Sequence, residues 1–366
     1  MTYSLSADKA LSRKRTWLIS LLLLVAPCAC RKEDPSQAQL ARVERQQALP
    51  APPRARLDSH KADEPLEQKT ANGPKKTTCP VFLESKSTGS LGAQLGEVSG
   101  LVASEEYPGL LWAHNDSGDS ATLYSISMAG KLERSFRLPR QAHDWEDIAI
   151  LSRPDKRALI YIADTGDNWS RRTTGVVLHR FKEPHLPYAS DAGGDRSAKI
   201  SKVESMHLTY PDGAHDSEAL LVDPWTAQVV LITKEKLGWP QIFSVEDFTA
   251  QATLHHEGAI TAQSAGATLF LVTGADVSPD GHWIILRTYT GVYLFYRGAE
   301  QSLAEALKTR ACLPSPPKEL QGESIAFLRT PPDEPSIGRS LPPSFLTVSE
   351  GAGASILLSE SKSGLP

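Results

Sequence analysis

Two short segments of this sequence repeat the same order of acidic side chains. The first reads A-H-D-W-E-D-I over residues 142–148, the second reads A-H-D-S-E-A-L over residues 214–220, and weaker copies lie at 97–101, 273–277 and 322–325. If the repeats form a ring, these carboxylates gather at one rim, and hard oxygen ligands of this kind favour Ca²⁺ or Mg²⁺ over zinc. The candidate cation ligands are Asp144, Glu146, Asp216, Glu218, Asp276 and Glu323.

Three roles are open for these acids. They hold a cation, they act in catalysis, or they accept backbone N–H bonds between repeats, and the structural role is the default. Two carboxylates about 5 Å apart repel by roughly 3 kcal/mol at an effective dielectric near 20, so a cluster requires a cation, a basic partner or raised pKa values. Lys234 and Arg287 stand where other repeats carry acids, so internal ion pairs are an available form of compensation.

Local catalytic signatures are absent from the sequence. It contains no G-x-S-x-G, no H-E-x-x-H, no P-loop and no G-x-G-x-x-G. The segments D-S-G-D-S (116–120) and D-T-G-D-N (164–168) are typical of hairpin turns. His143 and His215 recur with the repeat, which favours packing, because a catalytic base is needed only once.

The elements that must position the acids are short β-strands. From residue 79 onward, apolar runs alternate with turns rich in Gly, Pro, Asp and Asn, and each repeat opening is followed by a second and a third strand. Aligning the openings at positions 99, 146, 218, 275 and 323 gives a period near 50 with insertions. This period predicts an all-β fold, a single β-propeller of five blades.

Two alternatives to this fold stay open. A degenerate sixth blade would lie between Trp169 and Pro211, and a β-sandwich is the rival fold. The last repeat lacks an outer strand, which Val81–Ser87 would supply by pairing across the closure of the ring.

The N-terminal part has the layout of an export signal and a tether. Basic residues at 13–15 precede an apolar run that ends at Cys28-Ala29-Cys30, so residues 1–30 predict a signal peptide of the lipoprotein type, with Cys30 as the acylated residue. Simple secretion and an uncleaved anchor are the alternatives. Residues 31–78 are poor in aromatic and β-branched side chains and predict a disordered tether, with a span of roughly 40 Å. Residues 79–366 form the predicted propeller domain.

The cysteines and the charge balance of this domain indicate its compartment and the class of partner to expect. Cys79 and Cys312 predict one disulfide in an oxidising compartment, with unpaired thiols as the alternative. Residues 79–366 carry 25 Lys and Arg against 35 Asp and Glu and show no basic stripe with interleaved aromatic residues, so no nucleic-acid partner is predicted.

Several motifs resemble those of a group of secreted bacterial propeller proteins, which are loosely similar to phytase-like and esterase-like propellers. They are D-W-E-D-I-A (144–149), Y-I-A-D-T-G-D-N (161–168), Y-P-D-G-A-H-D-S-E-A-L (210–220), A-D-V-S-P-D-G (275–281) and R-T-Y (287–289). The resemblance spans roughly residues 95–355 and is specific for fold more than for activity. A phytase's calcium ligands have no residue-by-residue match here.

These observations lead to two functional hypotheses. The first is an exported, lipid-anchored propeller that acts as a binding or scaffold module at the cell envelope and engages an envelope protein or a small-molecule ligand. Its membrane contact is the lipid on Cys30. The second is an esterase or phosphoesterase that uses Ca²⁺ or Mg²⁺ at the acidic rim. No cofactor is certain from the sequence.

Overall fold

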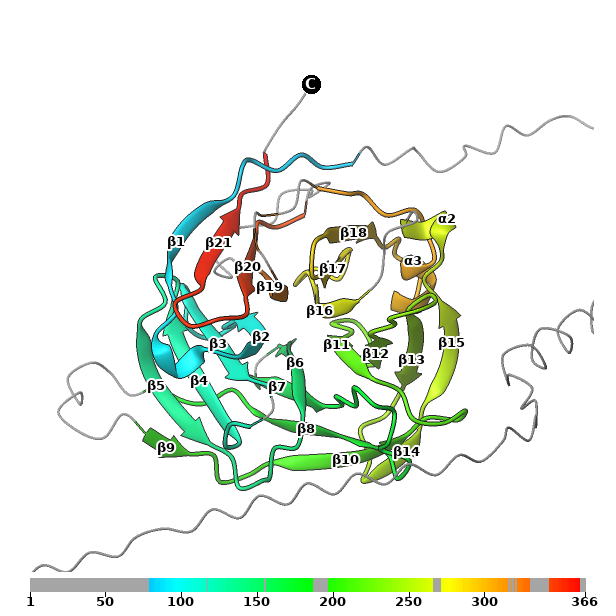
Figure 1. The fold of residues 1–366 in the computed structure, drawn as a ribbon, viewed down its shortest axis with the longest axis horizontal. Helices are drawn as coiled ribbons and strands as arrows, with labels where there is room; N and C mark the ends of the chain where they lie inside the picture. Colours follow the sequence, from blue (N-terminus) through cyan, green and yellow to red (C-terminus); the bar gives the residue numbers. More distant parts are fainter. Residues whose placement is uncertain are drawn as a thin grey trace, which may run out of the picture. The chain divides into compact units, whose positions relative to one another are not determined.

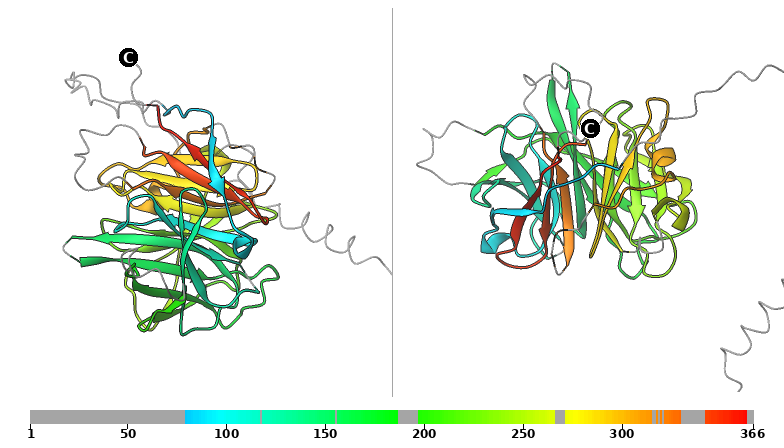
Figure 2. Two further views of the ribbon diagram at one scale, coloured as in Figure 1. Left: turned by 90° about the vertical axis from the view of Figure 1, so that its left-hand side faces the viewer. Right: turned by 90° about the horizontal axis from the view of Figure 1, so that it is seen from above.

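The structure is a computed structural model, which describes residues 79–362 except 117, 155, 187–196, 266–270, 315–316, 318, 320 and 330–341. Short strands of these residues form five sheets, arranged as blades around a central axis (Figure 1). In two side views the strands run along this axis (Figure 2). The fold is therefore a five-bladed β-propeller, which confirms the prediction from the repeat period.

The first strand of each blade lines the central axis. These inner strands are β2 (Val98–Ala103), β6 (Trp145–Arg153), β11 (Ser217–Val222), β16 (Val272–Val277) and β19 (Gly322–Phe327). Each contacts the inner strands of both neighbouring blades, and the contact of β19 with β2 closes the ring. Every residue of β2, β11, β16 and β19 is buried, because neighbouring blades cover both faces of an inner strand.

The remaining strands follow outward from each inner strand, mostly in antiparallel order. The first blade adds β3 (Leu110–Asn115), β4 (Thr122–Ser127) and β5 (Leu132–Arg137), and the second adds β7 (Lys156–Asp164), β8 (Val176–Lys182) and β10 (Glu204–Thr209). The third adds β12 (Val229–Thr233), β13 (Gln241–Val245) and β15 (His255–Ala259). The fourth adds β17 (Trp283–Thr288) and β18 (Val292–Tyr296), and the fifth adds β20 (Phe345–Ser349) and β21 (Ser355–Ser359).

Three outermost strands join a blade from elsewhere in the chain. β1 (Lys86–Ser90) pairs with β21 and completes the fifth blade. The sequence predicted this closure, although it placed the strand a few residues earlier. β9 (Ser197–Lys199) pairs in parallel with β5 of the first blade, and β14 (Gln251–Thr253) pairs in parallel with β10 of the second. The interval proposed for a sixth blade thus supplies strands to the first two blades.

A disulfide and three short helices complete the described fold. Cys79 is bonded to Cys312 with a Cα separation of 5.4 Å, which confirms the predicted pairing. The helices are η1 (Ala93–Leu95), α2 (Ala262–Ala265) and α3 (Leu303–Leu307). Within the described ranges, no helix has the length and apolar character needed to cross a membrane.

The hydrophobic core is divided among the blades. Five clusters of buried apolar side chains lie one in each interface between neighbouring blades. Trp112 and Trp145 fill the interface of the first and second blades, and Trp283 that of the fourth and fifth. Since each large apolar side chain contributes about 1.5–3 kcal/mol when buried, the blades stabilise one another.

Every inner strand has a β-bulge near its start, and the bulge fixes which residues are equivalent. The pairing register shifts at Ser99, Glu146, Glu218, Thr273 and Glu323. The fourth repeat is therefore aligned at Thr273, and the predicted alignment at Ala275 was wrong by two residues. Three of the five equivalent positions carry glutamate, so the bulge places these three acids at the same end of the ring.

Candidate functional site: an acidic channel mouth

A polar cavity of about 160 Å³ opens at the end of the ring where the inner strands begin. Its lining comes from the starts of the inner strands and from the residues that follow the second strand of each blade. The lining residues are Glu97, Val98, Ser99, Asp116, Glu146, Asn168, Glu218, Lys234, Tyr289, Gln321, Glu323 and Glu350. We call this cavity the channel mouth.

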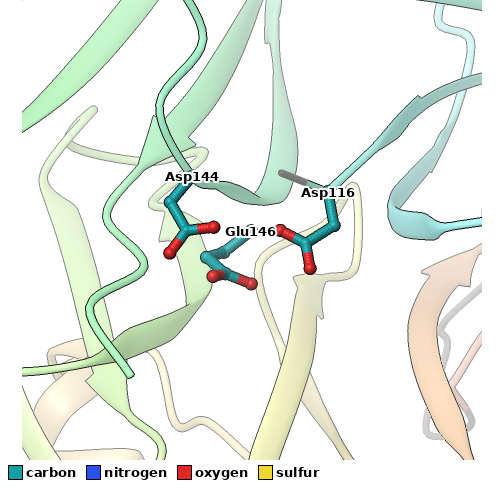
Figure 3. Close-up of side chains that lie close together, drawn as sticks. All are labelled: Asp116, Asp144 and Glu146. Carbon is teal, nitrogen blue, oxygen red and sulfur yellow. The ribbon is translucent and has the colours of Figure 1, made fainter. Parts of the chain in front are cut away.

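Two groups of carboxylates meet at or beside the channel mouth. In the first group, carboxylate oxygens of Asp116, Asp144 and Glu146 lie within 4.8 Å of one another (Figure 3). In the second group, oxygens of Glu146, Asp216 and Glu218 lie within the same distance. Glu146 belongs to both groups. At this separation, each pair of ionised carboxylates would repel by about 3 kcal/mol at an effective dielectric near 20.

Glu146 is the least compensated acid of the cluster. Its side chain is 3% exposed, and its carboxylate accepts no hydrogen bond from another described residue. Burial raises the pKa of Glu146 well above its ordinary value, and the charges of Glu218, Asp116 and Asp144 raise it further. Asp216 is 9% exposed, and its Oδ2 is buried without a partner. Oxygen atoms without partners are what a bound cation would satisfy.

Lys234 compensates one side of the cluster. Its Nζ lies 2.6 Å from a carboxylate oxygen of Glu218 and 4.8 Å from the centre of the Tyr289 ring. Burial alone would lower the pKa of Lys234, but the Glu218 carboxylate holds it above its ordinary value. Among the lining residues that the structure describes, Lys234 is the only basic one. The second carboxylate group therefore already contains a cation.

Several acids of the site hold their protons near neutral pH. Burial, together with Asp116 and Asp216, raises the pKa of Asp144 to about 7. Burial also raises the pKa of Glu218 to about 8, although Lys234 opposes the shift. The pKa of Glu323 is raised by burial to about 7, and its carboxylate accepts a hydrogen bond from Gln321 Nε2 at 2.9 Å. Without a cation, the cluster is partly neutralised by protons.

The turn at 164–168 holds the first carboxylate group in place. The Asp164 carboxylate accepts hydrogen bonds from the backbone of His143 and Asp144, at 3.0 and 3.3 Å. Gly166 packs directly against the acids, because a Cβ atom there would lie 1.9 Å from Glu146 Oε1. This segment was interpreted from the sequence as a turn, and its glycine lets the backbone approach the carboxylates.

Asp276 and Arg287, which the sequence placed at the acidic rim, do not line the channel mouth. Asp276, a candidate cation ligand, lies further along its inner strand than the bulge, away from the channel mouth. Its carboxylate accepts backbone N–H bonds from Val277 and Phe327, both at 2.8 Å, and lies 3.3 Å from the Arg329 guanidinium. It thus joins the fourth and fifth blades. Arg287, the second basic neighbour expected, is fully buried and pairs with Glu319 at 2.8 Å.

The remaining candidates fall into three sets. Asp144, Glu146, Asp216, Glu218 and Glu323 are brought together as the repeat alignment anticipated, and Asp116 joins them from the end of β3. Neither His143 nor His215 lines the channel mouth. Asn168 and Tyr289 also line the channel mouth; the sequence analysis named them only within a turn motif and the R-T-Y segment and assigned neither to a site. Cys30 lies outside the described residues.

Comparisons with known proteins add little to this geometry. No protein-family model matches the chain, and no curated protein does. Solved structures with a similar fold include an auxiliary nutrient binding protein from Bacteroides thetaiotaomicron VPI-5482, at 9% identity and a TM-score of 0.41. That match covers 75% of this chain and 63% of the other, so this chain spans less than two thirds of that protein's length.

Two further structures are similar at the same level. One is the PQQ-bound form of aldose sugar dehydrogenase from Streptomyces coelicolor, at 10% identity and a TM-score of 0.38, covering 78% of this chain and 100% of that one. The other is the calcium structure of a Trichoderma reesei carbohydrate-active enzyme of family AA12, at 10% identity and a TM-score of 0.41, covering 80% and 100%. Similarity of this degree assigns no activity or ligand, and the resemblance to phytase-like propellers stays a prediction.

Proposed function

We propose that this propeller is a binding module that holds a divalent cation, Ca²⁺ or Mg²⁺, at its channel mouth and uses it to engage a ligand. The observation that carries the proposal is the Glu146 carboxylate, which is 3% exposed, has no hydrogen-bond partner among the described residues, and belongs to both carboxylate groups. A buried carboxylate in a structural role accepts hydrogen bonds, as those of Asp147 and Asp276 do.

The first carboxylate group is the better cation position. Asp116, Asp144 and Glu146 supply three oxygen ligands, whereas Glu218 in the second group is already paired with Lys234. The channel mouth, at about 160 Å³, has room for several waters. A hard cation takes six to eight ligands, so ligand oxygens and waters would complete its coordination.

Calorimetric titration of the purified protein with Ca²⁺ and Mg²⁺ tests the proposal. The wild-type protein should bind one equivalent of cation. Glu146→Gln should lose this binding, because it replaces the carboxylate that belongs to both groups by a neutral amide. Glu133→Gln, a change of an acid on the outer strand β5, is the matched control and should bind as wild type does. Absence of heat with either cation, at millimolar concentrations, would overturn the proposal.

A second candidate function rests on Asp144. Its pKa of about 7 in the cation-free protein and its partial exposure would let it exchange a proton with a ligand, which is the behaviour of a general acid or base; for this candidate function Asp116 and Glu146 hold the cation without Asp144, because coordination would lower its pKa. The corresponding activity is hydrolysis of carboxylate or phosphate esters. A panel of such esters, assayed with Ca²⁺, Mg²⁺ and EDTA, should then show turnover that EDTA abolishes and that Asp144→Asn lacks. Turnover unaffected by both would exclude this candidate.

We also propose that the domain works outside the cytoplasm, anchored by a lipid on Cys30. The disulfide between Cys79 and Cys312 supports this, since such bonds persist in oxidising compartments. Cells fed an alkyne fatty acid should label the wild type, and Cys30→Ser should lose both the label and membrane retention. A Cys28→Ser variant is the control and should keep both.

A further inference from the structure

A groove of about 580 Å³ lies between the first and second blades, away from the channel mouth. It is lined from β5 and β9 on one side and from β7 and β8 on the other, which meet at the edge of the ring (Figure 1). Strand β6 carries Glu146 near its start and Arg153, a lining residue of the groove, at its end. Seven steps of extended strand separate these two residues by roughly 23 Å. The groove shares no lining residue with the channel mouth.

The lining of this groove is strongly basic on an acidic domain. Six basic side chains face two acidic ones, although residues 79–366 carry fewer basic than acidic residues overall. The basic residues are Arg153, Arg157, Arg180, Lys182, Lys199 and Lys202. A local reversal of charge of this kind favours anions at this one place.

Neither acid of the groove is placed to neutralise its exposed lysines. Glu183 is fully buried, and its Oε1 accepts hydrogen bonds from Trp112 Nε1, at 2.7 Å, and from the Ser104 hydroxyl, while its Oε2 is buried without a partner and burial raises its pKa. Glu204 lies 2.5 Å from an Arg180 nitrogen, and this partner lowers the pKa of Glu204. Neither carboxylate is therefore free to neutralise the lysines.

The lysines of the groove remain available to a ligand. Lys182 and Lys199 are exposed, and neither forms an ion pair with another described residue. Lys202 is also exposed, and its Nζ lies 4.0 Å from Glu204, too far for a strong bond. Lys182 ends β8 and Lys199 ends β9, so the two ammonium groups come from both walls.

The base of the groove is apolar. Phe136 and Phe181 are 4% and 3% exposed, and Leu159, Ala198 and Ile200 lie beside them in the lining. Basic walls around an apolar base match a ligand that has an acidic group and a hydrocarbon or ring body. A volume of about 580 Å³ also falls in the range of roughly 300–1,000 Å³ that is typical of small-molecule sites.

We propose that this groove binds an anionic amphiphile, with its carboxylate or phosphate group between Lys182 and Lys199 and its apolar body over Phe136, Phe181 and Ile200. The site is independent of the cation at the channel mouth, so EDTA and Glu146→Gln should leave it unchanged. Failure of the cation proposal would not affect it, and the reverse also holds.

Titration of the purified protein with dodecyl phosphate, below its micelle concentration, tests the proposal. Dodecyltrimethylammonium, which has the same tail and the opposite charge, should bind at least about tenfold more weakly, and inorganic phosphate alone should bind more weakly still. The double variant Lys182→Glu/Lys199→Glu should weaken dodecyl phosphate binding by about tenfold or more. Lys86→Glu/Lys131→Glu changes two exposed lysines, one on β1 and one in the turn before β5, neither of which lines the groove; this control should bind as wild type.

Several results would overturn the proposal. Undetectable binding of dodecyl phosphate, equal binding of the cationic amphiphile, or unchanged binding by the groove variant would each do so. A glutamate-rich peptide that binds where dodecyl phosphate does not would assign the groove to a protein partner instead. Because Ile200 is only half buried, Ile200→Ser provides a second variant, which should fold and lose affinity for dodecyl phosphate more than for inorganic phosphate.

Discussion

Replacing Glu146 by glutamine should separate cation binding from a structural role. Burial and the neighbouring acids raise the pKa of Glu146 well above its ordinary value, which favours the protonated form in the absence of a cation. Glutamine matches the protonated acid in size and removes no hydrogen bond made to another described residue. We therefore expect the variant, in EDTA at pH 7, to melt within about 2 °C of wild type, since changes without a specific mechanism stay near 0.5 kcal/mol.

Added cation should then distinguish the two proteins. A ligand that binds only the folded state stabilises it by about 2.7 kcal/mol when present at 100 times its dissociation constant. For a domain of this size, 1 kcal/mol corresponds to roughly 2 °C, so the wild type should gain about 5 °C on addition of Ca²⁺. Glu146→Gln should gain less than about 1 °C, because it lacks the ligand shared by both carboxylate groups.

Differential scanning calorimetry of both proteins, with Ca²⁺ and with EDTA, is the assay. The control is Asp276→Asn, because this carboxylate accepts two backbone N–H bonds at 2.8 Å and lies away from the channel mouth. That variant should lose about 1–3 kcal/mol of stability and keep the full response to Ca²⁺. A wild-type melting temperature that is the same in Ca²⁺ and EDTA would refute the reasoning, as would an undiminished response in Glu146→Gln.

Four further predictions concern the same molecule. The pKa of Asp144 and of Glu323 is about 7, and that of Glu218 is about 8, so above about pH 4 the cation-free folded protein binds more protons than the unfolded chain does. Its melting temperature in EDTA should therefore fall as the pH rises from 6 to 9. The fall should be smaller in Ca²⁺. Lys234→Met removes the basic partner of Glu218 and should tighten cation binding or add a second equivalent in calorimetric titration; weaker binding would contradict this. Gly166→Ala should weaken Ca²⁺ binding without removing a ligand, since the new Cβ would lie 1.9 Å from Glu146 Oε1; unchanged affinity would mean that the turn moves freely. Cys79→Ser/Cys312→Ser should lower the free energy of unfolding in urea by about 2–5 kcal/mol, since the disulfide closes a loop of 233 residues. An unchanged urea midpoint would show that the hydrogen bonds of β1 hold the N-terminal segment on the fifth blade without the disulfide.

Most of the fold follows from patterns that the sequence displays directly. The five aligned repeat openings, at positions 99, 146, 218, 275 and 323, give the blade count, and two cysteines leave only one pairing within the domain. The outer strands β9 and β14 were not predicted, because each has three residues and pairs with a blade distant in the chain. Strands this short carry no periodicity, and their pairing depends on how neighbouring blades pack.

The site was less predictable for a physical reason. The bulge position of the fourth inner strand is Thr273 and not an acid, so an alignment by acidic residues used Asp276 and placed the repeat at Ala275, two residues away from the true position. Asp116 belongs to a turn motif, and the same residue type serves turns and cation sites. The sequence pattern places Asp116 at the end of a second strand, among the polar residues expected near the rim, but its distance to Glu146, which comes from another blade, makes it a candidate ligand. Distances between blades cannot be read from a repeat pattern.

The contrast among the buried acids bears on the affinity to expect at the channel mouth. The Asp147 carboxylate accepts backbone N–H bonds from Ile148, Leu220 and Ala275, so its charge is balanced by the fold itself. Glu146, one residue earlier, has no such donor among the residues that the structure describes, and its raised pKa favours a bound proton in the absence of a cation. A cation must therefore displace protons from this cluster, which weakens its binding at neutral pH. Three carboxylates with this competition suggest a dissociation constant of about 10⁻⁴ to 10⁻³ M for Ca²⁺, the range of extracellular modules. Calorimetric titration at pH 6 and pH 8 checks this reasoning, because affinity should rise with pH and protons should be released on binding, and an affinity independent of pH would mean that the cation occupies oxygens other than those of Asp144 and Glu146.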